Sequence, residues 1–129
     1  MRLDTLGCQH VDMRPRVLIV DDHADFRESA SALLEAEGYE VVGAAADGET
    51  AMIEVERLRP GIVLVDIQLP GIDGFDVAER LASSDAAPAV ILISSRDAGA
   101  YGSRIDEAPV RGFLGKRSLS GAALADLVR

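Results

Sequence analysis

Short runs of β-branched residues and leucine recur along this chain, separated by stretches whose apolar residues have a helical period. Runs that are apolar on both faces are typical of strands buried in a parallel sheet. Strands that alternate with helices, joined by right-handed crossovers, build an α/β fold. We therefore predict a doubly wound, five-stranded parallel sheet with helices on both faces. The predicted strands are 16–20, 40–45, 62–66, 89–93 and 110–114.

The stretches between these runs have the apolar spacing of helices that pack one face on a sheet. They predict helices at about 24–37, 48–58, 74–83 and 118–128. The stretch 97–107 contains Gly99 and Gly102, and each glycine costs about 1 kcal/mol of helix propensity relative to alanine. We expect a short or mobile helix there. Residues 1–15 have no regular period, which predicts a mobile tail ahead of one domain at 16–129.

Length and charge narrow the class of protein. A chain of 129 residues suits one hydrophobic core. No apolar run approaches the ~18 residues of a membrane span, and the net charge of −9 disfavours binding to nucleic acid. The single cysteine, Cys8, excludes an internal disulfide, and the first residues lack an apolar secretory signal. We expect a cytoplasmic protein with no direct nucleic-acid or membrane partner.

Polar residues stand where four of the predicted strands end. Asp21 and Asp22 follow the first strand, Asp66 closes the third, Ser94 follows the fourth, and Lys116 follows the fifth. The carboxyl ends of parallel strands meet at one edge of the sheet, where ligands of open α/β sheets bind. The sequence therefore predicts one crevice that holds three carboxylates, a hydroxyl and an ammonium.

Three carboxylates in one crevice repel one another unless a cation is present. Mg²⁺ prefers oxygen ligands and keeps several waters, so it suits such a set. With Mg²⁺ and Lys116, the charges of the crevice balance. A carboxylate can then act as a nucleophile toward phosphorus, because aspartyl phosphate is an established covalent intermediate. The crevice is thus a candidate site for a divalent cation and a phosphoryl group.

Five sequence features, carried by four segments in this order, match a known family. The five features are the acidic pair that ends VLIVDD at the first strand, the aspartate that closes the third strand, the Pro-Gly loop that follows it in DIQLPGIDG, the hydroxyl residue that ends ILIS at the fourth strand, and GFLGK at the fifth. Over residues 16–129 the chain resembles the receiver domain of two-component response regulators. The resemblance implies a flavodoxin-like (CheY-like) doubly wound (βα)5 fold.

The resemblance also implies a role for each crevice residue. Asp66 would be the phosphoacceptor. Asp22 would bind Mg²⁺ directly, Asp21 mainly through water, and Gln68 through its backbone carbonyl, with Asp66 also a ligand. Lys116 and Ser94 would contact the phosphoryl group.

Further positions are implied by the same family. Phe113 matches the aromatic residue that changes rotamer, and with Ser94 it would remodel the surface around the fourth helix, fifth strand and fifth helix. Gln68 and Arg96 stand where the family tunes dephosphorylation. Arg117 replaces the usual proline after the lysine, and a cis bond before a non-proline residue costs about 3 kcal/mol. We therefore expect a different path for the Lys116 loop.

The implied function is that of a signalling domain that assists its own modification and does not turn over a substrate. It would take a phosphoryl group, with Mg²⁺, from a histidine kinase or histidine phosphotransfer protein and regulate a downstream protein or output domain. A phosphorylation-dependent homodimer is a further expectation. The chain ends at Arg129, where the last helix finishes, so we expect a stand-alone receiver or the receiver piece of a longer regulator.

Other interpretations stay open at this point. One is a Mg²⁺-dependent phosphohydrolase of the haloacid dehalogenase type, although Gln68 and Ala24 stand where that family has its second aspartate. A flavodoxin-like cofactor binder lacks its phosphate loop here, and a degenerate receiver would act without phosphorylation. Asp21–Asp22 or Ser94–Ser95 could instead cap helices, and Phe113 could be core packing. His23 has no second histidine nearby, which disfavours zinc.

Overall fold

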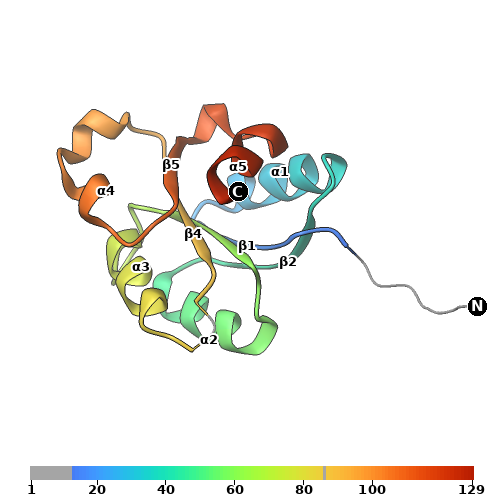
Figure 1. The fold of residues 1–129 in the computed structure, drawn as a ribbon, viewed down its shortest axis with the longest axis horizontal. Coiled ribbons are helices and arrows are strands. Elements are labelled where there is room, and N and C mark those ends of the chain that lie inside the picture. Colours follow the sequence, from blue (N-terminus) through green and yellow to red (C-terminus); the bar gives the residue numbers. More distant parts are fainter. Residues whose placement is uncertain (1–12, 86) are drawn as a thin grey trace, which may run out of the picture.

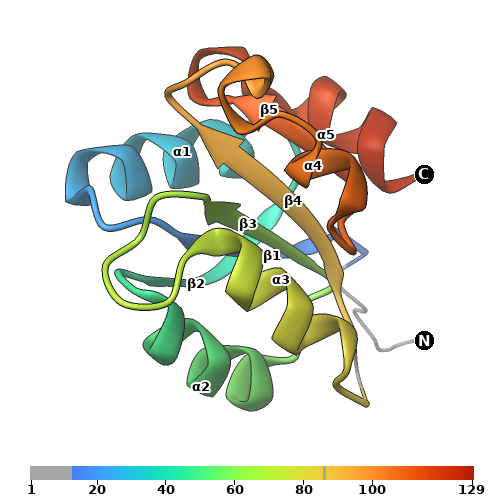
Figure 2. The same ribbon diagram turned by 90° about the vertical axis from the view of Figure 1, so that its left-hand side faces the viewer.

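A computed structural model describes residues 13–85 and 87–129. In this part of the chain, five strands form one parallel sheet in the order β2-β1-β3-β4-β5 (Figure 1). The arrowheads of β3 and β4 point the same way in Figure 2, as the parallel register requires. The strands are β1 (Arg16–Val20), β2 (Glu40–Ala45), β3 (Ile62–Asp66), β4 (Ala89–Ser94) and β5 (Gly112–Gly115). The predicted doubly wound α/β sheet is confirmed.

Helices cover both faces of the sheet. One face carries α1 and α5, and the other carries α2, α3 and the short α4 (Figure 1). The helices are α1 (Ala24–Ala36), α2 (Gly48–Leu58), α3 (Gly74–Ala82), α4 (Arg104–Glu107) and α5 (Gly121–Val128), with 3₁₀ turns η1 (Ala98–Tyr101) and η2 (Lys116–Ser118).

The core is divided into two layers because successive strand residues point to opposite faces of the sheet. On β1, Leu18 and Val20 pack under α2 and α3, while Val17 and Ile19 pack under α1 and α5. All four side chains are fully buried. Burial of one such side chain contributes roughly 1.5–3 kcal/mol, so the central strands hold their register and fix where each strand ends.

Three elements differ from the prediction by more than one residue at a boundary or in their division. The N–H of Val110 turns back to the carbonyl of Ala108, at 2.8 Å, so β5 begins at Gly112. The last helix begins at Gly121 because the Ser120 hydroxyl accepts a hydrogen bond from the N–H of Ala123, at 3.0 Å. The predicted short helix at 97–107 is divided into η1 and α4, with Gly102 between them at φ +59°.

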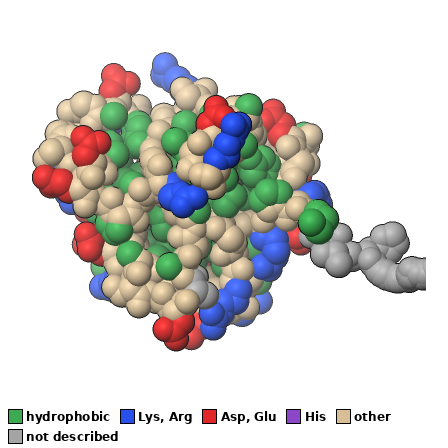
Figure 3. Space-filling view, viewed as in Figure 1, with side chains coloured by type: hydrophobic (Ala, Val, Ile, Leu, Met, Phe, Trp, Pro, Cys, Tyr) green, Lys and Arg blue, Asp and Glu red, His purple; other side chains and the backbone are tan. Residues whose placement is uncertain are grey.

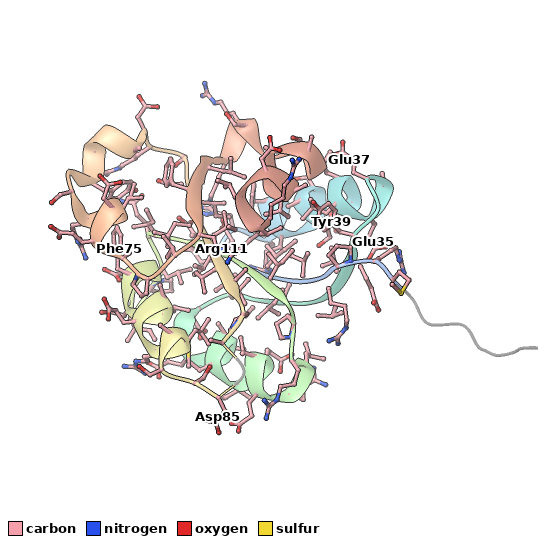
Figure 4. All side chains as sticks on the ribbon, in the orientation of Figure 1. Glu35, Glu37, Tyr39, Phe75, Asp85 and Arg111 are labelled. Carbon is pink, nitrogen blue, oxygen red and sulfur yellow. The ribbon has the colours of Figure 1, made fainter. Side chains whose placement is uncertain are left out.

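The start of α5 is held against the end of α1 by two side chains. The Tyr39 hydroxyl donates to the carbonyl of Gly121 at 2.7 Å, and Glu37 accepts a hydrogen bond from the N–H of the same glycine (Figure 4). A Cβ at Gly121 would lie 2.8 Å from Glu37 Oε1. This close approach fixes the helix that follows the Lys116 loop.

The predicted tail at 1–15 lies mostly outside the described residues, which also excludes Cys8 and His10. Arg14 is described, and its guanidinium lies 3.2 Å from Glu35 Oε1. Within residues 13–85 and 87–129, no helix has the length and apolar character needed to cross a lipid bilayer.

Candidate functional site

The strand ends bring the predicted polar residues to one edge of the sheet. Asp66 is the last residue of β3 and Ser94 the last of β4. Asp21 follows β1 directly, and its N–H donates to the carbonyl of Ala45 at 3.0 Å. Lys116 follows β5. The predicted crevice is therefore present, and its side chains come from four separate strands.

Lys116 joins the two buried carboxylates of this crevice. Its Nζ lies 2.6 Å from Asp21 Oδ2 and 3.2 Å from Asp66 Oδ2. The same Nζ lies 4.7 Å from the centre of the Phe26 ring, on α1. Burial lowers the pKa of Lys116, but the hydrogen bond to Asp21 and the attraction of Asp66 outweigh it and raise the pKa. The ammonium therefore stays charged.

The Asp66 carboxylate is almost entirely buried, at 3% exposure. Its Oδ1 accepts a hydrogen bond from the N–H of Gln68 at 3.1 Å. Burial raises the pKa of Asp66, and the charge of Asp21 adds to this, while the Gln68 N–H and Lys116 oppose it. Asp66 is thus a poorly solvated carboxylate with its two oxygens held by different partners.

Asp21, Asp22, His23 and Asp66 form the acidic cluster of this edge, with ligand atoms that lie within 4.8 Å of one another. Asp21 is fully buried, whereas the Asp22 side chain is 38% exposed. His23 Nδ1 lies 3.0 Å from Asp21 Oδ1 and 3.2 Å from Asp22 Oδ1. The sequence disfavours zinc at His23, which has no second histidine nearby, and it does not predict that this side chain lies beside both aspartates.

The donor set fits a hard divalent cation. Three carboxylates meet, one of them open to solvent, and Mg²⁺ prefers a few carboxylate oxygens together with retained waters. Asp21 Oδ2 faces the Lys116 ammonium and accepts no other hydrogen bond in the described part of the chain. That the backbone carbonyl of Gln68 is also a metal ligand stays a prediction.

The capping interpretation of the acidic pair is wrong. The N-cap of α1 is His23, whose side chain makes no capping bond, and neither Asp21 nor Asp22 caps the helix. Instead, Asp21 Oδ1 accepts the N–H of His23 at 2.8 Å. The N-cap of η1 is Asp97, so Ser94 and Ser95 do not cap that turn.

Ser94 makes a contact that the sequence did not predict. Its Oγ lies 2.6 Å from the hydroxyl of Tyr101, at the end of η1, and accepts the N–H of Arg96 at 3.0 Å. An aromatic residue between two glycines in the weakest predicted helix was the only signal for Tyr101 in the sequence. The hydroxyl at the end of β4 is thereby tied to the segment that follows it.

Phe113 lies in an aromatic cluster formed by Phe75, Tyr101 and Phe113. The ring centres of Tyr101 and Phe113 are 6.4 Å apart, and those of Phe75 and Tyr101 are 6.0 Å apart, edge to face. Phe75 lies between α3 and the α4 segment (Figure 4), with the Arg104 guanidinium 4.1 Å from its ring centre. Phe113 therefore packs against the core in this structure, as the core-packing interpretation expects. Its role as a switch stays a prediction.

A groove of about 730 Å³ adjoins the crevice, between residues 94–100 and 115–118. Arg96 and Arg117 line it, together with Ser94 and Lys116. Figure 3 shows acidic and basic side chains interspersed on another face, with acidic ones around the α4 segment. Asp97 also lines the groove, but positive side chains outnumber this carboxylate there, in contrast with the acidic balance of the whole chain.

The Lys116 loop contains a 3₁₀ turn at Lys116–Ser118, and the described residues include no cis peptide bond. Lys116 reaches both carboxylates even though Arg117 follows it. The predicted different path of this loop stays a prediction.

Gly74 sets the approach of α3 to the end of β3. Its N–H donates to the carbonyl of Ile67 at 2.9 Å. A Cβ at this position would lie 2.5 Å from the backbone oxygen of Asp66. The preceding residue, Asp73, caps α3 in a reciprocal bond with Asp76. Only glycine lets the capped helix lie so close to the carboxyl end of this strand.

Comparison with known proteins identifies relatives of this chain. The family model of the response regulator receiver domain matches residues 17–129. The chain is 48% identical over 81 residues to a protein-glutamate methylesterase/protein-glutamine glutaminase of Myxococcus xanthus, covering 62% of this chain and 23% of that protein. It is 40% identical over 94 residues to the transcriptional regulatory protein PdtaR of Mycobacterium tuberculosis, covering 66% and 46%. The chain thus spans less than half the length of these relatives.

A solved structure supports the same conclusion. The signal receiver domain of the response regulator NarL from Mycobacterium tuberculosis is similar to this chain with a TM-score of 0.78 and 34% identity. The similarity covers 88% of this chain and 94% of that one. The fold is therefore the flavodoxin-like, CheY-like α/β fold.

Proposed function

We propose that this chain, which belongs to the response regulator receiver domain family, accepts a phosphoryl group on Asp66 with the help of Mg²⁺. Receiver domains are the phosphorelay modules of two-component systems, and this membership is the premise of the proposal. The observation that carries it is the bridge from Lys116 to Asp66 and Asp21, at 3.2 and 2.6 Å.

Asp66 is the best nucleophile among the three carboxylates. It ends a central strand of the sheet, and Lys116 lies beside its Oδ2 to neutralise an incoming phosphoryl group. Asp21 is less suited because its Oδ2 has the shorter contact to Lys116, at 2.6 Å, and its Oδ1 accepts the N–H of His23 at 2.8 Å. Asp22 is the most solvated of the three, so it suits a metal ligand better than an activated nucleophile.

In the proposed step, an oxygen of Asp66 forms a bond to phosphorus. At the same time, the P–N bond of a phosphohistidine, or the P–O bond of an acyl phosphate, breaks. The leaving nitrogen or oxygen keeps the electron pair of that bond. Lys116 holds the charge on the phosphoryl oxygens, and Ser94 donates its hydroxyl to one of them.

The acidic cluster would hold the metal. Asp22 and Asp21 are the proposed ligands, together with Asp66 and the backbone carbonyl of Gln68. When bound, Mg²⁺ supplies positive charge that offsets the repulsion among the carboxylates and the phosphoryl oxygens. The cluster geometry within 4.8 Å supports this assignment.

The partners follow from the family. Members of the receiver family interact with histidine kinases and with output domains. We propose that this chain takes its phosphoryl group from a histidine kinase or a histidine phosphotransfer protein and regulates a downstream protein or domain. Ser94 and Phe113 would change packing in that switch, while Gln68 and Arg96 would set the lifetime of the phosphorylated form. A phosphorylation-dependent homodimer and a cytoplasmic location belong to the same proposal.

The test is incubation with acetyl phosphate and Mg²⁺, followed by intact-mass measurement. Wild type should gain the mass of one phosphoryl group, and Asp66→Asn should gain none. Asp25→Asn is the matched control, because it neutralises an exposed carboxylate of α1 near the same edge. It should gain the phosphoryl group like wild type.

Other outcomes separate the rival interpretations. Gain of mass in Asp66→Asn would place the acceptor elsewhere. No gain in wild type, together with no binding of beryllofluoride in the presence of Mg²⁺, would make the chain a degenerate receiver. Release of phosphate from many phosphomonoesters would favour the phosphohydrolase.

A further inference from the structure

The hydroxyl of Ser94 is held by the segment that follows β4. Its Oγ accepts the N–H of Arg96 at 3.0 Å and lies 2.6 Å from the Tyr101 hydroxyl. A serine hydroxyl has one donor and two acceptor positions, so these two bonds occupy most of its capacity. In the described structure Ser94 makes no hydrogen bond to Asp66 or Lys116.

The Asp66 carboxylate is occupied separately. Its Oδ1 accepts from Gln68 and its Oδ2 pairs with Lys116. Ser94 is fully buried, so a turn of its hydroxyl toward a phosphoryl oxygen on Asp66 would stretch or break the bond to Tyr101. The Ser94 hydroxyl can therefore bond either to Tyr101, as in this structure, or to a phosphoryl oxygen on Asp66, but not to both.

Residues 98–107, which contain Tyr101, have only partly buried or exposed side chains. Neither η1 nor α4 contains a buried residue, α4 is four residues long, and Gly102 separates the two at φ +59°. Tyr101 links the segment to the core through Ser94 and through rings on α3 and β5. Ile105 also packs against the core, and Arg104 lies over the Phe75 ring. Segments with few buried contacts open at low free-energy cost.

We propose that Tyr101 is a positioning residue for Ser94. Its hydroxyl holds the Ser94 hydroxyl away from Asp66 until a phosphoryl group competes for it. The release then frees residues 98–107 to rearrange. Phe113 has no hydroxyl, so the polar partner of Ser94 comes from η1 and not from β5. This inference rests on the proposed phosphorylation of Asp66.

The variant Tyr101→Phe removes the hydroxyl and keeps the ring that packs on Phe75 and Phe113. One hydrogen bond is worth about 0.5–1.5 kcal/mol, so the initial rate of phosphorylation by acetyl phosphate should rise about two- to tenfold. Tyr39→Phe is the matched control, because it removes a hydroxyl with a 2.7 Å bond to Gly121 elsewhere in the chain. Its rate should equal that of wild type.

A double variant shows whether Tyr101 acts through Ser94. In a Ser94→Ala background, Tyr101→Phe should leave the rate unchanged, because the bond is already lost. The inference is overturned if Tyr101→Phe phosphorylates at the wild-type rate or more slowly. It is also overturned if the increase persists without the Ser94 hydroxyl.

Amide hydrogen exchange of the unphosphorylated proteins tests the bond apart from the phosphoryl chemistry. Residues 98–107 should exchange faster in both Tyr101→Phe and Ser94→Ala, and the double variant should exchange no faster than either. Unchanged exchange in both single variants would overturn the inference. Failure of wild type to gain a phosphoryl group would overturn the proposed function instead, and the exchange measurement would still decide whether Tyr101 holds Ser94.

Discussion

Lys116 Nζ lies 2.6 Å from Asp21 Oδ2, closer than its 3.2 Å approach to Asp66 Oδ2. The ammonium therefore pairs with two carboxylates. Its shorter contact is to Asp21, a proposed metal ligand that is not the proposed phosphoacceptor. A cation that takes over the charge of Asp21 would leave Lys116 to Asp66. This relationship makes the lysine a structural counterion of two buried carboxylates, in addition to its proposed role as a phosphoryl contact.

Lys116→Met should destabilise the protein, because it leaves two buried carboxylates without their counterion. Loss of one partner of a buried pair costs roughly 3–5 kcal/mol, and partial exposure of the lysine reduces this to about 1–3 kcal/mol. Urea denaturation at pH 7 measures the free energy of unfolding. Arg117→Met, which removes an exposed neighbouring cation, should change it little. Equal losses in both variants would contradict a specific role for the buried pair.

Mg²⁺ should raise the melting temperature in a concentration-dependent way, because it binds the folded acidic cluster. At 100 times the dissociation constant, the gain is about 2.7 kcal/mol. Asp22→Asn should remove most of this shift, while Asp25→Asn should keep it. Calorimetric melts with and without Mg²⁺ measure the effect. A shift that survives Asp22→Asn would mean that the cation binds elsewhere.

The stability contributed by Asp66 should depend on pH in a definite direction. Burial raises its pKa above the usual value of 3.8, so the folded state binds the proton more tightly than the unfolded state. Stability from this group is full below the unfolded pKa and is lost as the pH rises through the raised folded pKa. Without metal, Asp66→Asn should therefore be more stable than wild type at pH 7.

The greater stability of Asp66→Asn relative to wild type should shrink as the pH falls through the raised pKa of Asp66. Denaturation of both proteins from pH 7 down to below 3.8, the usual pKa of an aspartate, measures this difference. Mg²⁺ affinity should fall over the same range, because the ligand must be deprotonated. A stability difference that is constant over this range would show that Asp66 titrates normally.

Gly74→Ala should be destabilising, because its Cβ would lie 2.5 Å from the backbone oxygen of Asp66. Such overpacking typically costs about 1–3 kcal/mol, and displacement of the acceptor strand should also slow phosphorylation. Gly99→Ala is the control, because a Cβ there meets nothing within 4 Å. Thermal melts and phosphorylation rates of the two variants test this. Similar behaviour of both would contradict the close approach.

The sheet and most of the crevice could be predicted because their signals are local. Apolar runs such as Ile62–Val65 indicate which segments are buried on both faces. The carboxyl ends of parallel strands must then lie at one edge of the sheet. Asp21, Asp66 and Lys116 therefore meet as expected. The chain also resembles a family whose motifs stand at these ends, and that family is confirmed.

Element boundaries were harder to predict, since they depend on single side-chain bonds. The start of α5 is set by Ser120 and by the contacts of Gly121 with Glu37 and Tyr39, which lie 84 and 82 residues earlier in the chain. The division of 97–107 depends on Gly102 and on the packing of Tyr101. Apolar periodicity carries no information about such distant partners.

Local sequence pattern was enough to predict the parallel sheet, the edge where its strands end and the residue types gathered there, because it indicates which segments are buried and in which direction the strands run. The pairing of side chains within that edge came from the packing of distant segments. The tertiary structure gave Lys116 its shorter contact to Asp21, placed His23 between two aspartates and joined Tyr101 to Ser94. These choices depend on rotamers and on distances of a few ångströms between side chains, which the order of residues along the chain does not specify.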